Sequence, residues 1–235
     1  MATQQSRYTL RQLLARVQGD LGLRGQALVT PQDVLDWAQE ASDMLATETY
    51  WFRTEATAGT TASTKYYDFP AGLLMIEDLF HDGLQLRQVT QNEMAQINYD
   101  WRNESSGTPL YYYLRGANGY ALHPTPSVTD VDILTLHYAA LPPIPSDNDD
   151  FFTIPTSQDG AIITYCLYRA ALKDITGEGR DRVAIYKAEW EQAKREFHAF
   201  VSGAQEGRLL VLGSDNSPSV WGYWDVLASG TVPPP

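Results

Sequence analysis

Four histidines, one cysteine and a short run of carboxylates are the residues of this chain that could bind a metal or move a proton. Such chemistry needs several of these side chains brought together. No histidine lies in a His-Glu-x-x-His motif, and none has zinc-finger spacing to a cysteine. His123 and His137 fit cross-strand neighbours on a sheet, where a surface or strand-edge role is favoured over a metal site. The histidines are His81, His123, His137 and His198.

The other candidate groups are also isolated. Cys166 sits in an apolar helical pattern without a cation nearby in the sequence, which is typical of a buried structural thiol. The carboxylates between Asp147 and Phe151 lack the glycine and distal glutamate of an EF-hand loop, so they indicate a solvated acidic loop. The sequence has no phosphate-binding loop, dinucleotide fingerprint or Gly-x-Ser-x-Gly elbow. We therefore predict no catalytic residue, no metal ligand, no cofactor and no enzyme activity.

The charge of the chain limits its partners. Lys and Arg number 17 against 29 Asp and Glu, so the net charge is 17 − 29 = −12. This balance excludes binding of nucleic acid through a general phosphate-neutralising surface. The simplest explanation for such a negative charge is solubility, and a more specific explanation is a surface that repels DNA. A lone cysteine fits a reducing compartment, and no apolar run approaches the roughly 20 residues of a membrane span, so we expect a soluble protein.

Two helical segments precede the middle of the chain and two follow it. Each carries apolar side chains at spacings of three and four, which is typical of an amphipathic helix. We expect helices over residues 10–21, 31–45, 157–176 and 183–203, with Thr30 capping the second and a turn at Gly177 and Gly179 before the fourth. Together they predict an antiparallel bundle of four long helices. Its core residues should include Leu167, Val183, Tyr186, Trp190 and Phe197.

The middle of the chain has the sequence pattern of short strands separated by turns. Segments from Leu74 to His81 and from Leu84 to Gln88 flank Asp82-Gly83, a two-residue hairpin signal that recurs at Asn118-Gly119. Thr90 and Glu93 form a capping box for a short helix running toward Trp101. The fold class is therefore α+β, with a sandwich-like β-rich domain inserted into the bundle. The predicted parts are residues 1–52 and 151–203 for the bundle, 53–150 for the insertion and 204–235 for an extended tail.

The tail is apolar but has no helical period. Glycine, proline and small polar residues interrupt any local element that could bury its apolar side chains. We therefore expect the tail to dock on its own bundle or on a neighbouring subunit or partner, with the second favoured. The predicted docking residues are Leu209, Leu210, Val211, Leu212, Trp221, Tyr223 and Trp224.

The order of these parts resembles one family, the head-to-tail connector proteins of tailed bacteriophages, also called adaptor or gatekeeper proteins. The likeness covers roughly residues 8 to 203, and its specific part is the order of several short phrases. These are Tyr67-Asp68-Phe69-Pro70, Asp82-Gly83-Leu84-Gln85-Leu86, Glu93 to Trp101, Gly107-Thr108-Pro109, Tyr111 to Tyr113, Leu122-His123-Pro124-Thr125-Pro126, Leu134-Thr135-Leu136-His137-Tyr138, Ala170-Ala171-Leu172 after Tyr165, and Tyr186 with Trp190.

The resemblance implies a structural ring, dodecameric in such connectors, that lies beneath the portal protein. Such a ring extends the DNA channel and docks a tail tube, nozzle or other tail protein, while genomic DNA passes without specific binding. It implies a place in the virion at the head–tail junction, and in the host cytoplasm during assembly. A stopper or tail-completion protein is a near alternative. A different class is a soluble recognition module whose tyrosine-rich sheet, around Tyr111–Tyr113, binds glycan or peptide, although tyrosines that alternate along a strand favour packing on both faces.

Overall fold

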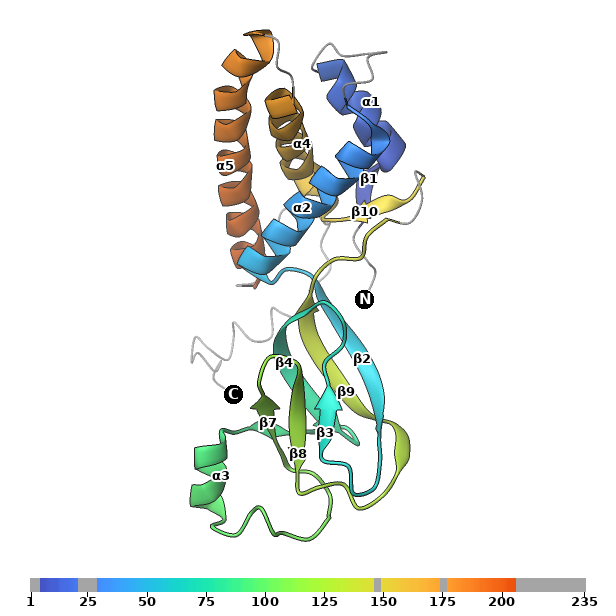
Figure 1. The fold of residues 1–235 in the computed structure, drawn as a ribbon, viewed down its shortest axis with the longest axis vertical. Coiled ribbons are helices and arrows are strands. Elements are labelled where there is room, and N and C mark those ends of the chain that lie inside the picture. The colour runs from blue at the N-terminus through green and yellow to red at the C-terminus, as the bar shows by residue number, and fades with distance from the viewer. Residues whose placement is uncertain (1–4, 21–28, 146–148, 174–176, 206–235) are drawn as a thin grey trace, which may run out of the picture.

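The molecule is elongated, with a helical unit at one end and a β unit at the other, joined at a narrow waist (Figure 1). The computed structural model describes residues 5–20, 29–145, 149–173 and 177–205. Two stretches of chain cross the waist, one after α2 and one after β9. The fold is α+β, as the sequence predicts.

The helical unit is not a bundle of four long helices, and that prediction was wrong. Its helices are α1 (Leu10–Asp20), α2 (Pro31–Thr49), α4 (Asp159–Lys173) and α5 (Gly177–Gln205), of 11, 19, 15 and 29 residues. The helices α4 and α5 pack side by side, whereas α2 crosses them obliquely (Figure 1). Gly177 and Gly179 lie within α5, which therefore starts earlier than its apolar stripe indicates. The turn expected at these glycines is also wrong.

A two-stranded ribbon completes this unit, and the sequence did not indicate it. Strand β1 (Gln5–Thr9) pairs antiparallel with β10 (Phe151–Thr153). The 3₁₀ turn η1 (Thr156–Gln158) follows Pro155 and leads into α4. Strand β1 reads Gln-Ser-Arg-Tyr-Thr, so it has no apolar alternation to predict it. The pairing joins segments more than 140 positions apart and depends on the tertiary fold.

The start of α2 follows directly from local chemistry. The Thr30 hydroxyl accepts a hydrogen bond from the Asp33 N–H at 3.2 Å, and the Asp33 carboxylate accepts one from the Thr30 N–H at 2.8 Å. Pro31 occupies the first turn, where its missing N–H costs nothing. The helix ends at Tyr50, whose backbone is left-handed with φ 52°. This reciprocal cap fixes the beginning of the helix that spans the unit.

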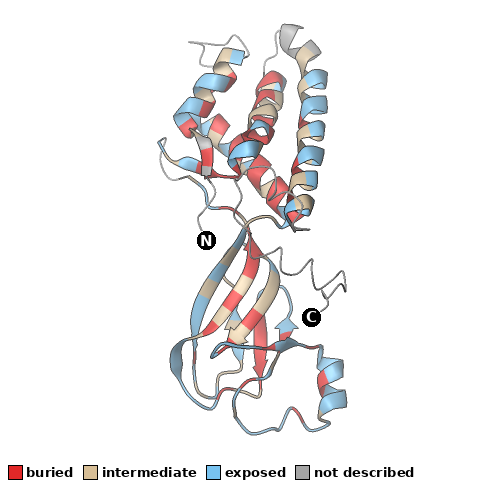
Figure 2. Ribbon diagram, turned by 180° about the vertical axis from the view of Figure 1, so that it is seen from behind, coloured by how far each residue is buried: buried red, intermediate tan, exposed pale blue. Residues whose placement is uncertain are grey.

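One apolar core holds the helical unit together, and its buried side chains come from every helix of the unit (Figure 2). Phe152 and Ile154 add the ribbon to this core. Further buried members are Leu10, Leu13, Val17, Val34, Trp37, Ala38, Leu45, Ile162, Tyr165, Leu167, Trp190, Phe197 and Val201.

The β unit contains two four-stranded sheets. The first has the order β2 (Arg53–Thr60), β9 (Asp130–Ala140), β4 (Leu73–His81) and β5 (Leu84–Gln85), all antiparallel. The second has the order β3 (Tyr66–Asp68), β8 (Gly119–His123), β7 (Tyr111–Arg115) and β6 (Arg87–Gln88), in which β6 and β7 are parallel. The capping box at Thr90 opens α3 (Gln91–Ile97), as predicted, but the helix ends before Trp101.

The two sheets share one core, so the sandwich-like prediction is only partly consistent with the structure. Leu79 and Leu136 from the first sheet cluster with Tyr120 and Leu122 from the second. The predicted strand from Leu84 to Gln88 instead divides at Leu86, whose N–H donates to the Leu79 carbonyl at 2.7 Å. The chain thus passes from one sheet to the other within a few residues, and the two sheets are joined along this side.

Turn chemistry explains the first hairpin. Asp82 and Gly83 both have positive φ, 50° and 73°, as a two-residue hairpin turn of this type requires. The second hairpin differs from its prediction, because Arg115 pairs with Gly119 and leaves a three-residue loop that begins at Gly116, φ 63°. Gly119 already belongs to β8, where a Cβ would lie 2.5 Å from the Tyr67 carbonyl oxygen. Glycine there allows the close pairing of β3 with β8.

Candidate interaction surfaces

The histidines are spread over both units and do not form a site. His123 lies in β8 of the second sheet and His137 in β9 of the first, so the prediction that they are cross-strand neighbours was wrong. The sequence could not assign the two strands to different sheets. His137 lies 3.7 Å from Glu55, and His198 lies 3.1 Å from Glu48.

His123 anchors a loop to the second sheet. Its side chain is 4 % exposed, and its Nε2 lies 2.8 Å from a carboxylate oxygen of Glu104. The Trp101 ring meets it edge to face at 5.7 Å between ring centres. Burial lowers the pKa of His123 and outweighs the opposing effect of Glu104, so the ring is neutral near pH 7. This polar contact is structural, because it ties the segment after α3 to the sheet.

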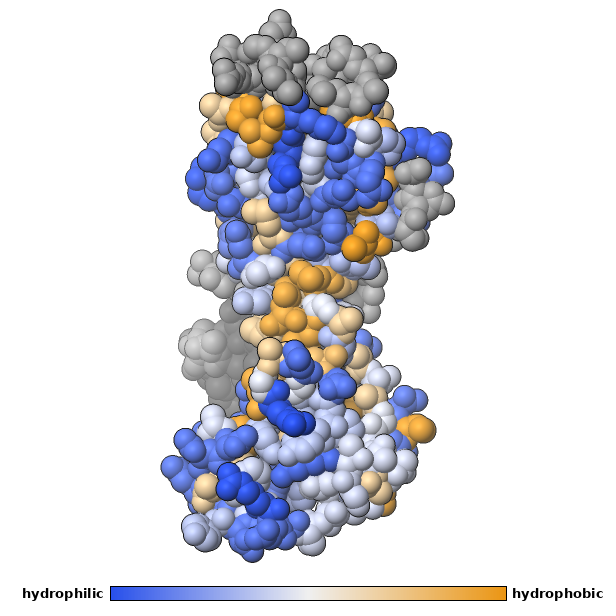
Figure 3. Space-filling model, in the orientation of Figure 1, coloured by the Kyte–Doolittle hydropathy of each residue, from blue (hydrophilic) through white to orange (hydrophobic). Residues whose placement is uncertain are grey.

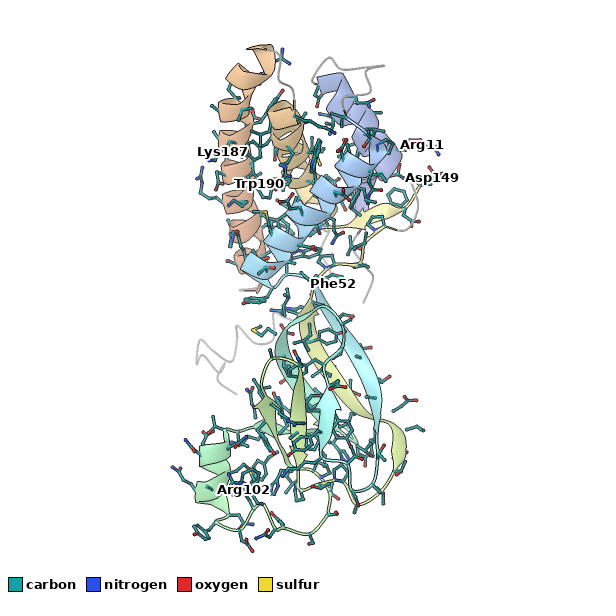
Figure 4. All side chains as sticks on the ribbon, in the orientation of Figure 1. Arg11, Phe52, Arg102, Asp149, Lys187 and Trp190 are labelled. Carbon is teal, nitrogen blue, oxygen red and sulfur yellow. The ribbon has the colours of Figure 1, made fainter. Side chains whose placement is uncertain are left out.

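Among the described residues, the thiol and Asp149 of the acidic segment are placed in structural contacts. Cys166 is completely buried in the helical core, and burial raises the pKa of its thiol, which disfavours the reactive thiolate. Asp149, within the predicted acidic loop, lies 3.5 Å from Arg11 of α1 (Figure 4). Within residues 5–20, 29–145, 149–173 and 177–205, no three His, Cys, Asp or Glu side chains gather as a metal site would require.

The tyrosine run packs on both sides of its strand, as predicted. Tyr112 enters the core between the sheets, whereas Tyr113 points to the opposite face. The ring centres of Tyr113 and Trp101 lie 5.6 Å apart. Tyr111 is half-buried beside the same cluster. These rings are therefore used by the fold, and they do not form an exposed face for sugar stacking.

One face of α2 forms an acidic hollow of about 580 Å³. Its lining residues are Asp36, Gln39, Glu40, Asp43, Met44, Thr47 and Glu48. Burial raises the pKa of Asp43, whose carboxylate accepts a hydrogen bond from Gln39 at 2.6 Å. Asp36 accepts a hydrogen bond from Gln32 at 2.7 Å. These two carboxylates have amide partners, so their negative charge is not neutralised by the contacts described.

Neighbouring helices supply cations to the rim of this hollow. Arg169 of α4 lies 2.6 Å from Glu40, while Lys194 and His198 of α5 lie 3.9 and 3.1 Å from Glu48. The carboxylates of Asp36 and Asp43 therefore keep their negative charge, whereas those of Glu40 and Glu48 have cationic neighbours.

The outer face of α5 contrasts with its inner face. Lys187 points away from the bundle and Trp190 points into it (Figure 4). Trp190 is 2 % exposed and lies 4.8 Å from the Tyr165 ring. Of the predicted core residues, Leu167, Trp190 and Phe197 are buried, whereas Val183 and Tyr186 are half-buried. The exposed outer residues of α5 include Ile185, Lys187 and Arg195.

Apolar surface gathers where the two units meet (Figure 3). Tyr50, at the end of α2, and Met75, near the start of β4, are 38 % and 40 % exposed. Trp51 lies between the units, edge to face with Phe52 at 5.6 Å and with Phe197 at 5.9 Å. Its indole nitrogen is buried without a hydrogen-bond partner among the residues described. The waist is therefore a packed joint with some apolar surface left uncovered.

The predicted docking residues of the tail lie outside the described residues. They are Leu209, Leu210, Val211, Leu212, Trp221, Tyr223 and Trp224.

Sequence reasoning missed the acidic hollow on α2. The residues Asp36, Glu40 and Asp43 recur at helical spacing, and this pattern could have revealed it. In the described part of the chain, no helix has both the length and the apolar character needed to cross a bilayer.

The family model described as SU10 adaptor protein matches residues 8–211. The chain belongs to this family of phage head-to-tail adaptors. A comparison with curated proteins finds no match. Membership identifies a structural protein of the phage particle, which works with other head and tail proteins. The connector resemblance drawn from the sequence is thereby confirmed.

Proposed function

We propose that this adaptor forms a dodecameric ring below the portal protein, where it extends the DNA channel and docks the tail. The observation that carries the proposal is the family match over residues 8–211, which covers most of the chain. In this role the protein acts during assembly in the host cytoplasm, and afterwards at the head–tail junction of the virion. DNA passes through the ring during packaging and ejection.

The two-unit shape supports a connecting role. The helical and β units lie end to end (Figure 1), so their far ends present different surfaces in opposite directions. A subunit of this form can contact the portal through one end and a tail tube or nozzle protein through the other. We assign residues 1–52 and 151–203 to one functional domain, 53–150 to the second and 204–235 to a docking tail.

The charge distribution supports passage of DNA without binding. Many cations are paired within the chain: Arg53 lies 2.8 Å from Glu77, Arg169 lies 2.6 Å from Glu40, and Lys173 lies 2.6 Å from Asp33. Paired cations are less available to neutralise phosphates, whereas the α2 face carries carboxylates with amide partners. A lumen lined by such a surface lets DNA slide.

Electron microscopy and mass measurement test this proposal. The purified protein is examined alone and after mixing with the portal protein of its phage. We expect rings of uniform size, either alone or seated on the portal, and co-sedimentation of the two proteins. A matched control uses an unrelated portal under the same salt conditions. A protein that stays monomeric in both mixtures and leaves the portal bare would overturn the proposal.

A further inference from the structure

The outer edge of β2 carries a row of unpaired backbone groups. Ala140 donates its N–H to the Phe52 carbonyl at 2.9 Å, which makes these two residues a hydrogen-bonded antiparallel pair. Such pairs alternate with non-bonded ones. Thr54 and Ala56 therefore bond to β9, whereas the N–H and C=O groups of Arg53, Glu55 and Thr57 point to the open edge. None of these six groups has a hydrogen bond to another described residue.

From Arg53 to Thr57 this edge has only part of the usual protection of a free strand. Natural proteins guard edges with proline, lysine and other charged side chains, very short strands or β-bulges. Strand β2 has eight residues and contains neither proline nor lysine, and its register shift lies farther along, between Ala58 and Thr60. Its two charged side chains have partners in the same sheet, because Arg53 contacts Glu77 of β4 at 2.8 Å and Glu55 lies 3.7 Å from His137 of β9. The backbone groups of this stretch are therefore open to pairing with another strand.

The chain beyond α5 supplies a matching segment. Helix α5 is described to Gln205, and 235 − 205 = 30 residues follow it. The only stretch there with four successive branched apolar residues is Leu209–Leu212. As an added strand, two of its side chains would extend the half-buried face formed by Thr54 and Ala56. Those two residues are small, which leaves room for leucine or valine beside them.

In the ring of the proposed function, a neighbouring copy can supply the segment that follows α5. Within one chain the end of α5 also lies at the waist near the start of β2 (Figure 1), where the ring centres of Phe197 and Trp51 are 5.9 Å apart, so the crosslinking experiment below distinguishes the two cases. A contact between two different surfaces of identical chains is heterologous, and it closes into a ring when the rotation allows.

We propose that the outer edge of β2 accepts the segment Leu209–Leu212 of a neighbouring copy as an added strand. This inference rests on the ring of the proposed function, and it names one of the contacts that hold neighbouring subunits together.

Proline at Thr57 tests the edge, because Thr57 is exposed and its N–H points outward. Thr57→Pro removes that donor without breaking a bond to β9, whereas Thr57→Ala removes the same side chain and keeps the donor. We expect Thr57→Pro to weaken self-association about tenfold and Thr57→Ala to leave it nearly unchanged. Analytical ultracentrifugation measures association, and circular dichroism checks that both variants fold. Equal association of two folded variants would overturn the strand addition.

Disulfide trapping identifies the occupant. The single native thiol, Cys166, is buried and stays out of the reaction. A Thr57→Cys chain is mixed with a Val211→Cys or a Leu210→Cys chain under mild oxidation, and we expect a crosslinked dimer of two different chains. A crosslink only within one chain that carries both changes would assign the edge to its own tail, and no crosslink would remove Leu209–Leu212 as occupant; either result overturns the inference. Rings on the portal that persist in those cases leave the proposed function standing, so the two failures are distinguishable.

Discussion

Trp190 shows how single residues of this protein serve packing rather than reaction. Its ring fills the space between α5 and Tyr165 of α4, and the ammonium of Lys194 lies 5.7 Å from the ring centre. His123 serves the β unit in a comparable way through Glu104 and Trp101. At this scale the buried polar and aromatic groups hold segments in place.

Replacing Trp190 with alanine should destabilise the helical unit strongly. The side chain is 2 % exposed, and a large buried ring replaced by alanine costs about 3 to 5 kcal/mol through lost burial and a cavity. Ile185→Ala on the exposed outer face of the same helix is the control, with an expected change within about 0.5 kcal/mol. Urea unfolding monitored by circular dichroism gives both values. Similar stabilities for the two variants would contradict the packing described.

His123 should make stability depend on pH. Its pKa is lowered in the folded protein, so the unfolded chain, with a pKa near 6.5, binds the proton more readily. The stabilising contribution is therefore complete above about pH 6.5 and is lost as the pH falls through the lower folded value. Melting temperatures between pH 7.5 and 5.5 should fall more steeply for the natural chain than for His123→Gln, which cannot titrate there. Parallel slopes would show that this histidine does not contribute.

At the scale of elements, local signals determine where several segments begin. The N-cap at Thr30, the capping box at Thr90 and the Asp82-Gly83 turn all form as the sequence indicates. Each uses only neighbouring residues, so no tertiary information is needed to predict it. The positive φ of Asp82 and Gly83 and the reciprocal bonds of Thr30 with Asp33 are direct consequences of residue type.

Removing the cap of α2 should cost a moderate amount of stability. Thr30→Ala eliminates the oxygen that accepts the Asp33 N–H, and such losses cost about 0.5 to 2 kcal/mol. Thr47→Ala is the matched control, because Thr47 is an exposed residue of the same helix whose hydroxyl bonds to the Asp43 carbonyl. Alanine there should be neutral or slightly stabilising. Thermal melts of the two variants would contradict the role of the cap if they shifted equally.

Elements that depend on distant partners could not be predicted in the same way. Strand β1 is polar and forms only through its pairing with β10. The strand expected from Leu84 to Gln88 divides because Leu86 bonds back to Leu79 while Arg87 pairs with Tyr111 of another sheet. The acidic hollow on α2 and the open edge of β2 need the fold as well, because burial and strand order decide which groups stay exposed.

At the scale of the whole molecule, charge and shape act together. The chain carries a net charge of −12, and its two units offer separate ends for contacts with other proteins. In the ring proposed above, DNA would move past such a chain without adhering. The acidic face of α2 would serve this passage or a contact with a basic neighbour.

Binding of duplex DNA should therefore be weak even at low salt. Phosphate neutralisation needs clustered Lys and Arg, and several of the described cations are already paired with carboxylates. Filter binding should show little retention and a shallow dependence on salt concentration. A variant with Asp36→Lys, Glu40→Lys and Asp43→Lys changes the net charge by six units, from −12 to −6, and concentrates the new charge on one helix face. This variant should bind DNA measurably, with a steeper salt dependence, which shows that the assay detects phosphate contacts. Tight, strongly salt-dependent binding by the natural chain would instead mean that it holds the phosphate backbone, and a channel wall past which DNA slides would then be the wrong description.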